Sequence, residues 1–423
     1  MKKNGKGDGK SRKLSRRTFL KVAGATGVAA LAGGFPSIIR SAQKDILIGE
    51  IHPLTGGLAQ TGTAFKVGME IAVEEINAAG GIKSLGGAKL KMLDADSQGK
   101  PEVGVAEAER LIKEGVVATF GCYQSAVALA VTQIHEKYRT PFLITLGISE
   151  KILERGFKYT FRTSCDSIIS VKEIIRLIPG FAKEMGTEVK TIATIYEDTL
   201  FGVTMSANAK KHAPEVGLEV VAEIPYNWKT TDLSAEITKL KAAKPDVIVP
   251  TGYLPDTILM ARTMKELKLN CKGIIGTVSG GLSNPIFARE AGDAAEYMMN
   301  GINWPNPLNP KTIAFAKKFE QRMKNPLGED GAYGYAPVYV LKDALERAKS
   351  TDRKAIRDAL AATNLSDHIL PQDKPIVFDE TGQNKNAGIL YTQVQKGVMY
   401  SVYPKKYAQM KPIFPVPRWE DRK

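Results

Sequence analysis

The fold is decided by the stretch Ile46-Leu-Ile-Gly-Glu-Ile-His-Pro-Leu-Thr-Gly-Gly-Leu-Ala-Gln60 and the residues that follow it. Residues 45–51 form a short run of mostly apolar side chains, which predicts a buried strand. Apolar residues then recur at helical spacing from Thr63 to Ala79, and the Gly80-Gly81 pair ends that helix. A strand, a loop and an amphipathic helix in this order are the first unit of an α/β domain.

The same unit recurs along the chain. In its first part, the pattern predicts further strands at 89–93, 116–120 and 141–145, and helices at 101–114 and 125–138. The rhythm then restarts, with strands at 191–196, 218–224, 246–249 and 273–276, and helices at 203–215, 233–243 and 256–267. Repeated strand–helix units predict parallel sheets covered by helices, and two such runs predict two similar lobes. Ligands of such sheets bind beyond the carboxyl ends of the strands, so we expect a site between the lobes.

Residues 1–42 have the pattern of an export signal. A basic segment precedes Ser15-Arg16-Arg17-Thr18-Phe19-Leu20-Lys21, and a weakly apolar run rich in glycine follows. This order is typical of a secretory signal, and the glycines argue against a membrane-spanning helix. The defined positions of the twin-arginine motif are occupied by Arg16, Arg17 and Phe19. We therefore expect export by the Tat translocase and cleavage near Ala42; a basic disordered tail and an uncleaved anchor are the alternatives.

Most of the basic excess of the sequence lies in this signal. It holds 10 Lys and Arg and 1 Asp, so it contributes +9 of the formal net charge of +14. The remaining 381 residues have 49 basic and 44 acidic side chains, a net charge of +5. No basic cluster with interleaved aromatic side chains stands out there, so we expect no nucleic-acid partner. A chain of this length exceeds a single hydrophobic core and predicts two domains.

The sequence has no recognisable catalytic, metal-binding or cofactor-binding motif. It lacks a glycine-rich nucleotide loop, a nucleophile elbow and a zinc-binding helix motif, and its His residues have no metal-ligand spacing. We expect no metal and no cofactor, and an enzyme is the minority hypothesis. Asp94 and Asp96 at a strand end favour hydrogen bonding at a loop start over acid–base catalysis. The wide spacing of Cys122, Cys165 and Cys271 favours buried thiols over a disulfide bond.

A set of motifs, ordered along the chain, points to a known family. After the opening stretch they are Gly68-Met-Glu-Ile-Ala-Val-Glu-Glu-Ile-Asn-Ala-Ala-Gly-Gly-Ile82, Phe161-Arg-Thr-Ser164, Tyr196-Glu-Asp-Thr-Leu-Phe-Gly202, Asp232-Leu-Ser-Ala-Glu-Ile-Thr-Lys-Leu-Lys241, Pro245-Asp-Val-Ile-Val249, Ala291-Gly-Asp-Ala-Ala-Glu296 and Phe378-Asp-Glu-Thr-Gly382. Together they resemble the leucine/isoleucine/valine-binding family of periplasmic solute receptors. The resemblance implies a type I periplasmic binding protein, with two doubly wound α/β lobes, that serves an ABC importer.

The resemblance also implies that three segments cross between the lobes and form a hinge. We place the crossings near Thr163, Ile302 and Gly388. Lobe 1 is then 45–163 and 303–388, and lobe 2 is 164–302 and 389–410. Residues 411–423 are expected to lie as a tail along the surface.

In this family the ligand carboxylate is held by hydroxyl and backbone N–H groups of two lobe 1 loops. Carried onto this sequence, the first loop supplies Ser125, which fits a helix N-cap that favours an anion or, equally, an ordinary cap. Ser149 matches the hydroxyl residue of the second loop. Tyr123 and Gln124 are candidate pocket walls, and Thr61 stands where the family often has an aromatic residue.

The resemblance implies that lobe 2 closes over the ligand with aromatic side chains. Phe201 and Tyr253 match those positions, although Phe201 fits a core residue equally well. Amino-acid receptors of the family place a Glu after the short strand of lobe 2 to pair with the ligand ammonium. Here Val278 or Ser279 stands at that place, so the obvious amine partner is missing. Carboxylates that could replace it from neighbouring loops are Glu197, Asp198 and Asp256.

We therefore predict a periplasmic receptor without catalysis, which binds its ligand between the lobes and delivers it to an ABC transporter permease. A branched-chain amino acid or a related small carboxylate is the expected ligand. A non-amino carboxylic acid, aromatic or aliphatic, is the alternative because a buried ammonium without a carboxylate partner is costly. An exported enzyme or a sensory ligand-binding module is the alternative of another class.

Overall fold

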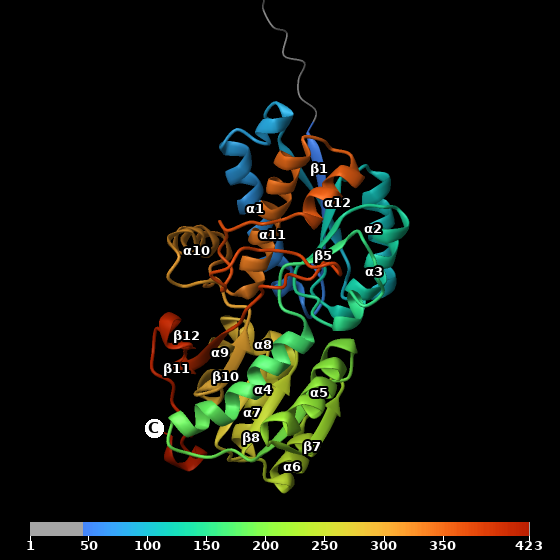
Figure 1. The fold of residues 1–423 in the computed structure, drawn as a ribbon. Helices are drawn as coiled ribbons and strands as arrows, with labels where there is room; N and C mark the ends of the chain where they lie inside the picture. The colour runs from blue at the N-terminus through green and yellow to red at the C-terminus, as the bar shows by residue number, and fades with distance from the viewer. Residues whose placement is uncertain (1–44, 423) are drawn as a thin grey trace, which may run out of the picture. The chain divides into compact units, whose positions relative to one another are not determined.

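A parallel five-stranded sheet organises the first part of the chain in the computed structural model, which describes residues 45–422 (Figure 1). Its strands are β1 (Ile46–His52), β2 (Leu90–Asp96), β3 (Ala118–Gly121), β4 (Phe142–Ile144) and β5 (Thr160–Arg162), in the order β2-β1-β3-β4-β5. The helices between them are α1 (Ala59–Ala78), α2 (Pro101–Lys113) and α3 (Ser125–Lys137). Side chains of β1 alternate between the two faces: Ile48 packs toward α1, and Ile51 packs toward α2 and α3. The predicted export signal, with Arg16, Arg17 and Phe19, lies outside the described residues.

A second sheet of seven strands, in the order β12-β11-β10-β9-β8-β6-β7, follows. Its parallel strands are β6 (Thr191–Glu197), β7 (Glu219–Tyr226), β8 (Val247–Thr251), β9 (Gly273–Thr277) and β10 (Met299–Ile302). The pair β11 (Leu390–Gln395) and β12 (Val398–Tyr403) adds an antiparallel hairpin at the β10 edge. The helices of this part are α4 (Ser167–Glu184), α5 (Leu200–His212), α6 (Ser234–Ala243), α7 (Leu254–Glu266), α8 (Gly280–Ser283) and α9 (Ile286–Ala291). The prediction of two sheet-and-helix lobes is confirmed.

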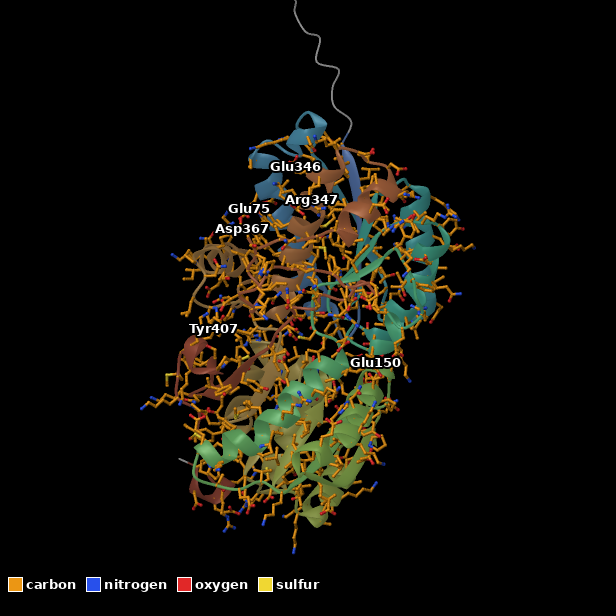
Figure 2. The ribbon with its side chains drawn as sticks, viewed as in Figure 1. Glu75, Glu150, Glu346, Arg347, Asp367 and Tyr407 are labelled. Atoms are coloured by element: carbon orange, nitrogen blue, oxygen red, sulfur yellow. The ribbon has the colours of Figure 1, made fainter. Side chains whose placement is uncertain are left out.

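Three helices that follow β10 return to the first sheet. They are α10 (Pro310–Met323), α11 (Glu329–Ala348) and α12 (Arg353–Ala361). Glycines let α11 lie directly against α1, because a Cβ at Gly68 would stand 2.2 Å from the Gly331 carbonyl oxygen and one at Gly334 would stand 2.2 Å from the Phe65 carbonyl oxygen. Glu75 of α1, which is labelled in Figure 2, accepts hydrogen bonds from Tyr335 and Tyr339 of α11 at 2.6 and 2.8 Å. This packing fixes the position of the α11 N-terminus.

The three connections between the two sheets lie side by side. The amide N–H of Cys165 donates to Asn303 Oδ1 at 3.2 Å. Gln383 Nε2 donates to the Ser164 carbonyl at 2.7 Å, and Asn384 Nδ2 donates to the Thr163 carbonyl at 3.0 Å. The sequence analysis divides the chain into lobes at these connections, and that division stays a prediction.

Helices α1 and α5 begin at least three residues earlier than their apolar periodicity predicts. Helix α1 begins at Ala59 rather than Thr63, which places Thr61 in its first turn instead of a loop. Its first turn packs closely through Gly62, where a Cβ would stand 2.0 Å from the Pro53 carbonyl oxygen. Helix α5 begins at Leu200 rather than Val203, so Phe201 is a helix residue. The spacing of apolar residues indicates only the buried stripe of a helix. A first turn that is held by backbone contacts contributes little to that stripe, so the pattern does not include it.

The three thiols and the C-terminal residues complete the fold. Cys122, Cys165 and Cys271 are free thiols, as the sequence favours. Within the last residues, Phe414 is buried against Phe181 with ring centroids 5.3 Å apart. Among the described residues no helix is both long and apolar enough to cross a membrane.

Candidate functional site

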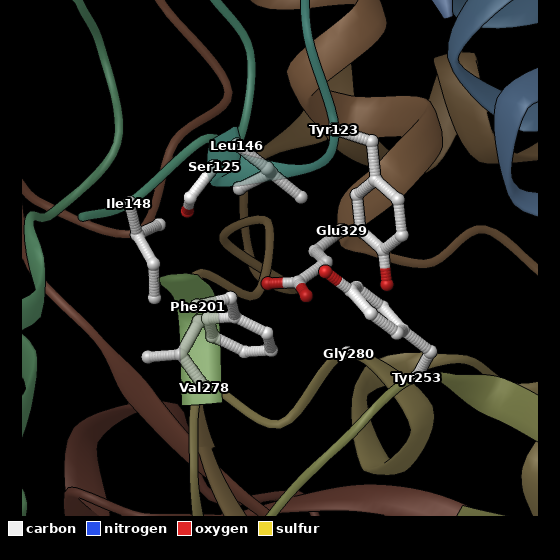
Figure 3. Close-up of a pocket in the computed structure, with 9 residues that line it drawn as sticks. All are labelled: Tyr123, Ser125, Leu146, Ile148, Phe201, Tyr253, Val278, Gly280 and Glu329. Atoms are coloured by element: carbon white, nitrogen blue, oxygen red, sulfur yellow. The ribbon is translucent and has the colours of Figure 1, made fainter. Parts of the chain in front are cut away.

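A small cavity lies where loops of both sheets meet (Figure 3). Its lining side chains come from the ends of strands and the starts of helices: Tyr123, Ser125, Leu146, Ile148, Phe201, Tyr253, Val278, Gly280 and Glu329. The space free to a water-sized sphere is about 20 Å³, far below the range of about 300–1,000 Å³ for ligand pockets. The cavity lies at the carboxyl ends of parallel strands, where α/β folds bind ligands, and a bound ligand requires its two sides to move apart.

Aromatic rings from both sheets form one wall of the cavity. The ring centroids of Tyr123 and Tyr253 are 5.6 Å apart, and those of Phe201 and Tyr253 are 5.7 Å apart. Trp228, which the sequence analysis did not select, packs on Tyr253 at 5.5 Å with its ring nearly perpendicular. Glycine at position 280 allows Tyr123 to lie this close, because a Cβ there would stand 2.1 Å from Tyr123 Oη. These contacts hold the two sheets together around the cavity and supply an apolar surface for a ligand.

Ser125 lines the cavity at the start of α3, but it is not the N-cap. Gln124 is the cap residue, with extended backbone angles (φ −81°, ψ 132°), and no side chain caps the helix. The prediction of an N-cap at Ser125 is therefore wrong by one position. Ser125 Oγ instead accepts a hydrogen bond from the Ser149 backbone N–H at 3.3 Å. The hydroxyl lies where the free N–H groups and the dipole of the 13-residue helix favour an anion.

Several predicted site residues support the cavity from outside its lining. Ser149 is fully buried, and its carbonyl accepts from Arg162 Nη1 at 2.9 Å. Gln124 points away, with Nε2 donating to the Gly99 carbonyl at 3.3 Å. Ser279 Oγ accepts from the Gly252 N–H at 3.2 Å and joins two lobe 2 loops. The structure thus gathers Tyr123, Ser125, Phe201, Tyr253 and Val278 at the cavity, and leaves Thr61, Gln124, Ser149 and Ser279 behind it.

The carboxylates suggested as replacement amine partners do not line the cavity either. Glu197 accepts hydrogen bonds from the backbone N–H groups of Thr199 and Gly202 at 2.7 and 2.6 Å, and so satisfies N–H groups at the start of α5. Asp256 accepts from Tyr226 Oη at 2.6 Å. Burial raises the pKa of Asp256 to about 7, although its hydrogen bonds lower it in part. Both carboxyl groups are committed to holding lobe 2 loops.

Glu329, at the first turn of α11, is the acidic residue that lines the cavity, and the sequence analysis missed it. Its side chain is 1% exposed, and Figure 3 shows the carboxyl group among the lining residues. Burial raises its pKa to about 7, while hydrogen bonds with Ser283 and Asn303 lower it in part. Oε2 of this group has no hydrogen-bond partner. Acidic side chains are common in the first turn of a helix, because the helix dipole stabilises their charge. The sequence therefore did not indicate that Glu329 lines a binding site.

Asp330 is a second buried carboxyl group beside Glu329. It is 4% exposed, and Oδ2 accepts from Asn284 Nδ2 at 3.3 Å, while Oδ1 has no partner. Burial and the neighbouring Glu329 raise its pKa well above the usual value. None of the lining residues of the cavity is Lys, Arg or His, so no basic side chain of the lining offsets the two carboxyl groups.

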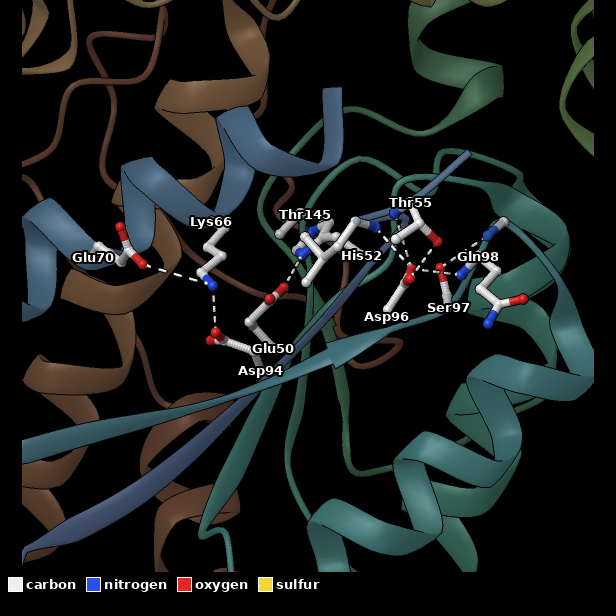
Figure 4. A network of polar contacts seen from close by, with 12 residues as sticks. Glu50, His52, Thr55, Lys66, Glu70, Asp94, Asp96, Ser97, Gln98 and Thr145 are labelled. Carbon is white, nitrogen blue, oxygen red and sulfur yellow. Dashed lines mark hydrogen bonds and ion pairs between the residues drawn. The ribbon is translucent and has the colours of Figure 1, made fainter. Parts of the chain in front are cut away.

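A buried polar network supports the loops of the first sheet (Figure 4). His52 Nδ1 lies 2.7 Å from Glu50 Oε2, and His52 Nε2 lies 3.1 Å from Thr145 Oγ1. Burial lowers the pKa of His52 to about 3 and raises that of Glu50 well above its usual value. The pair is therefore neutral, with Glu50 donating to Nδ1 and Nε2–H donating to Thr145. It joins the ends of β1 and β4 below the cavity loops.

Asp94 and Asp96 form structural contacts, as the sequence analysis favours. Asp96 Oδ1 accepts from the backbone N–H groups of Leu54 and Gln98, each at 2.8 Å, and Asp94 pairs with Lys66 (Figure 4). Across the part of the chain that the structure describes, no three His, Cys, Asp or Glu side chains are grouped to hold a metal ion.

Comparisons with known proteins agree with this architecture. A family model described as periplasmic binding protein matches residues 45–397. The Leu/Ile/Val-binding protein homolog 7 of Brucella suis is 29% identical over 385 residues, covering 89% of this chain and 94% of that protein.

Two solved structures illustrate the fold. The chain is similar to a leucine-binding protein of Thermotoga maritima, with a TM-score of 0.74, 23% identity and coverage of 85% of this chain and 98% of that one. It is also similar to an ABC transporter solute-binding protein of R. palustris in complex with benzoate, with a TM-score of 0.72, 19% identity and coverage of 87% and 99%. These likenesses confirm the predicted fold class of two α/β lobes.

Proposed function

This chain belongs to the periplasmic binding protein family, whose members are binding proteins and not enzymes, and from that membership we propose that it is the solute receptor of an ABC importer. It binds a branched-chain amino acid or a related small carboxylate in the cavity of Figure 3 and delivers it to the membrane permease. The observation that carries this proposal is the composition of the cavity. The start of α3, in the first lobe, favours an anion, and aromatic side chains from both lobes form the wall. The names of the Brucella relative and the Thermotoga structure support an amino-acid ligand.

We propose that the ligand carboxylate binds at Ser125 and the first turn of α3. The hydrogen bond from Ser149 orients the Ser125 hydroxyl, so Ser149 acts as a positioning residue. Gln124, Thr61 and Ser279 act in the same indirect way, through the loops that they hold. The side chain of the ligand then lies against Tyr123, Phe201, Tyr253 and Val278.

The three connections at 163–166, 303–309 and 384–389 are proposed as the hinge between the lobes. A ligand that touches both lobes favours the closed arrangement by its differential affinity for that state, and the closed protein docks on the permease. The aromatic contact between Tyr123 and Tyr253 is one of the contacts between the lobes that opening would break.

We propose that the protein works in the periplasm after twin-arginine export. Replacing Arg16 and Arg17 together with Lys is expected to keep the full-length chain in the cytoplasmic fraction, because the translocase reads the paired guanidinium groups. Periplasmic recovery equal to that of the unchanged protein would exclude this route.

A non-amino carboxylate remains the second candidate ligand. The apolar Val278 lines the cavity where the family's amino-acid receptors have a Glu, and the R. palustris protein of similar fold was solved with benzoate. Isothermal titration calorimetry of the purified protein against L-leucine, L-isoleucine, L-valine, their deaminated oxo acids and benzoate separates the two classes.

The receptor proposal itself requires one of these carboxylates to bind. Ser125→Ala is then expected to weaken that ligand about tenfold through the lost hydrogen bond. Ser234→Ala, on the exposed start of α6, is the matched control. Absence of binding by every carboxylate, or an unchanged affinity for Ser125→Ala, would overturn the proposal for this cavity.

A further inference from the structure

Glu329 of α11 gives the cavity an acidic end, apart from the anion-favouring end at the start of α3, and Asp330 is buried next to Glu329 without lining the cavity. Glu329 Oε2 and Asp330 Oδ1 are both buried without a hydrogen-bond partner. A buried carboxyl group in this situation either keeps a proton or meets a cation, since an unpaired charge out of water is costly. None of the residues that line the cavity supplies that cation.

The position of Glu329 is not explained by capping of its own helix. Gly328 is the N-cap of α11, and it has no side chain to cap the first turn. The hydrogen bonds that lower the pKa of Glu329 come from Ser283 and Asn303, which belong to other segments. They leave Oε2 without a partner, and Figure 3 shows the carboxyl group in the cavity between Ser125 and Tyr253.

We propose that Glu329, supported by Asp330, binds an ammonium group of the ligand, so that the receptor recognises an amino acid from α11 of lobe 1. This inference rests on the proposed receptor function. Val278 stands where the family's amino-acid receptors have a Glu, and Glu329 would take over the role of that Glu. Glu329 lies more than two hundred residues after Ser125 in the sequence. The ligand is then a zwitterion whose carboxylate lies at Ser125 and whose ammonium group lies at Glu329.

Charge argues for an amine over a second anion at this end. Glu329 lines the cavity and Asp330 is its buried neighbour, so a ligand carboxylate placed against Glu329 would add a third acidic group with no basic side chain in the lining. An ammonium group instead reduces the repulsion between Glu329 and Asp330 and fills the free acceptor position on Oε2.

The two ligand classes predict opposite proton exchange on binding. The groups that face Glu329 are Asp330 and Tyr333 on α11, Tyr123 on the loop after β3, and Tyr253 at the start of α7. Burial raises the pKa of all three tyrosines and of Asp330, whereas the pKa of Glu329 is about 7, so Glu329 is the group of this set that titrates near neutral pH. An ammonium group favours the ionised form of Glu329, so binding releases protons. A carboxylate near Glu329 favours the protonated form, so binding takes protons up.

The test is calorimetry of the whole protein with L-leucine, L-isoleucine, L-valine and their deaminated oxo acids, in phosphate and in Tris buffer. The difference between the two buffers gives the number of protons exchanged. We expect an L-amino acid to bind with net proton release, and its affinity to rise from about pH 6 to about pH 8 as the carboxyl group of pKa near 7 ionises. This measurement needs no variant and does not depend on the folding of a mutant.

Variants then identify the residue. Glu329→Gln keeps the shape and is expected to weaken the amino acid about 10- to 100-fold, the effect of a hydrogen bond to a charged group. It should leave the oxo acid unchanged or bound more tightly. Glu320→Gln, with the same charge change on the exposed face of α10, is expected to match the unchanged protein.

The outcomes separate the two proposals. Preferred binding of an oxo acid over its amino acid, net proton uptake with the amino acid, or an unchanged amino-acid affinity in Glu329→Gln would overturn the ammonium site and leave the receptor function standing. Absence of binding by amino acids, oxo acids and benzoate alike would overturn the receptor function with it.

Discussion

Nε of Arg162 donates a hydrogen bond to Oε1 of Gln383 at 2.7 Å, which joins the end of β5 to the third connection between the lobes. The same guanidinium donates from Nη1 to the carbonyl oxygens of Gly147 and Ser149 at 2.8 and 2.9 Å. Arg162 is fully buried, and burial lowers its pKa to about 10, so it remains charged at neutral pH. One side chain thus fixes both the loop behind the cavity and the neighbouring connection.

Arg162→Met is expected to destabilise the protein by about 3–5 kcal/mol, because each buried acceptor left without its donor costs about 1–3 kcal/mol. Urea unfolding of the two proteins measures this difference. Arg289→Met, at an exposed position on α9, is the control and should change stability by less than about 0.5 kcal/mol. Equal effects of the two substitutions would show that Arg162 does not hold these loops.

The Glu50–His52 pair predicts a loss of stability as the pH rises above about 6.5. In the folded protein the pair holds one proton, on Glu50, because the pKa of Glu50 is raised and that of His52 is lowered to about 3. In the unfolded chain, with ordinary pKa values of 4.5 and 6.5, the pair holds two protons below pH 4.5, one between the two values and none above pH 6.5. Folding therefore requires proton uptake above pH 6.5, which opposes folding as the pH rises.

Glu50→Gln is expected to remove this part of the pH dependence, because the amide cannot ionise and can still donate to His52. The measurement is the free energy of unfolding in urea at about pH 6.5 and about pH 8.5, compared between variant and unchanged protein. Glu329 and Asp330 have raised pKa values too and contribute with the same sign in both proteins, so only the difference reports on Glu50. Identical slopes would contradict the neutral pair.

Local periodicity predicts the alternating strands and helices of residues 45–145 and 191–276, whereas helices α4 and α10 to α12 were not predicted. The β1 strand and the α3 helix, for example, follow from one run of apolar residues and one apolar stripe. Site residues that directly follow a strand, such as Tyr123 and Tyr253, could be predicted for the same reason. Glu329 could not, because α11 reaches the cavity only through its close packing on α1 at Gly68 and Gly334. A contact made by two distant helices leaves no periodic signal in either one.

Gly280 is expected to control how closely the lobes approach. A Cβ at this position would meet Tyr123 Oη at 2.1 Å, so Gly280→Ala should oppose closure and weaken the ligand about tenfold or more. Tyr123→Phe removes the clashing oxygen, and the double variant Gly280→Ala/Tyr123→Phe should recover part of the affinity. Gly180→Ala on α4, where a Cβ would meet nothing within 4 Å, is the control. Additive losses in the double variant would rule out this contact as the cause.

Asn284, between α8 and α9, is expected to act as a latch on the closed arrangement. Its Nδ2 lies 3.2 Å from Gln60 Oε1 of α1 and 3.3 Å from Asp330 Oδ2 of α11, so both contacts join the second sheet's helices to the first lobe. Asn284→Ala removes them, which should favour the open arrangement and weaken the ligand about five- to tenfold. Calorimetry measures the affinity, and small-angle X-ray scattering of the protein without added ligand measures the opening as a larger radius of gyration. Asn270→Ala, at an exposed position after α7, is the control, because its side chain bonds Trp419 and Glu420 and forms no hydrogen bond with Gln60 or Asp330. A compact scattering profile together with unchanged affinity in Asn284→Ala would show that Asn284 does not hold the lobes closed.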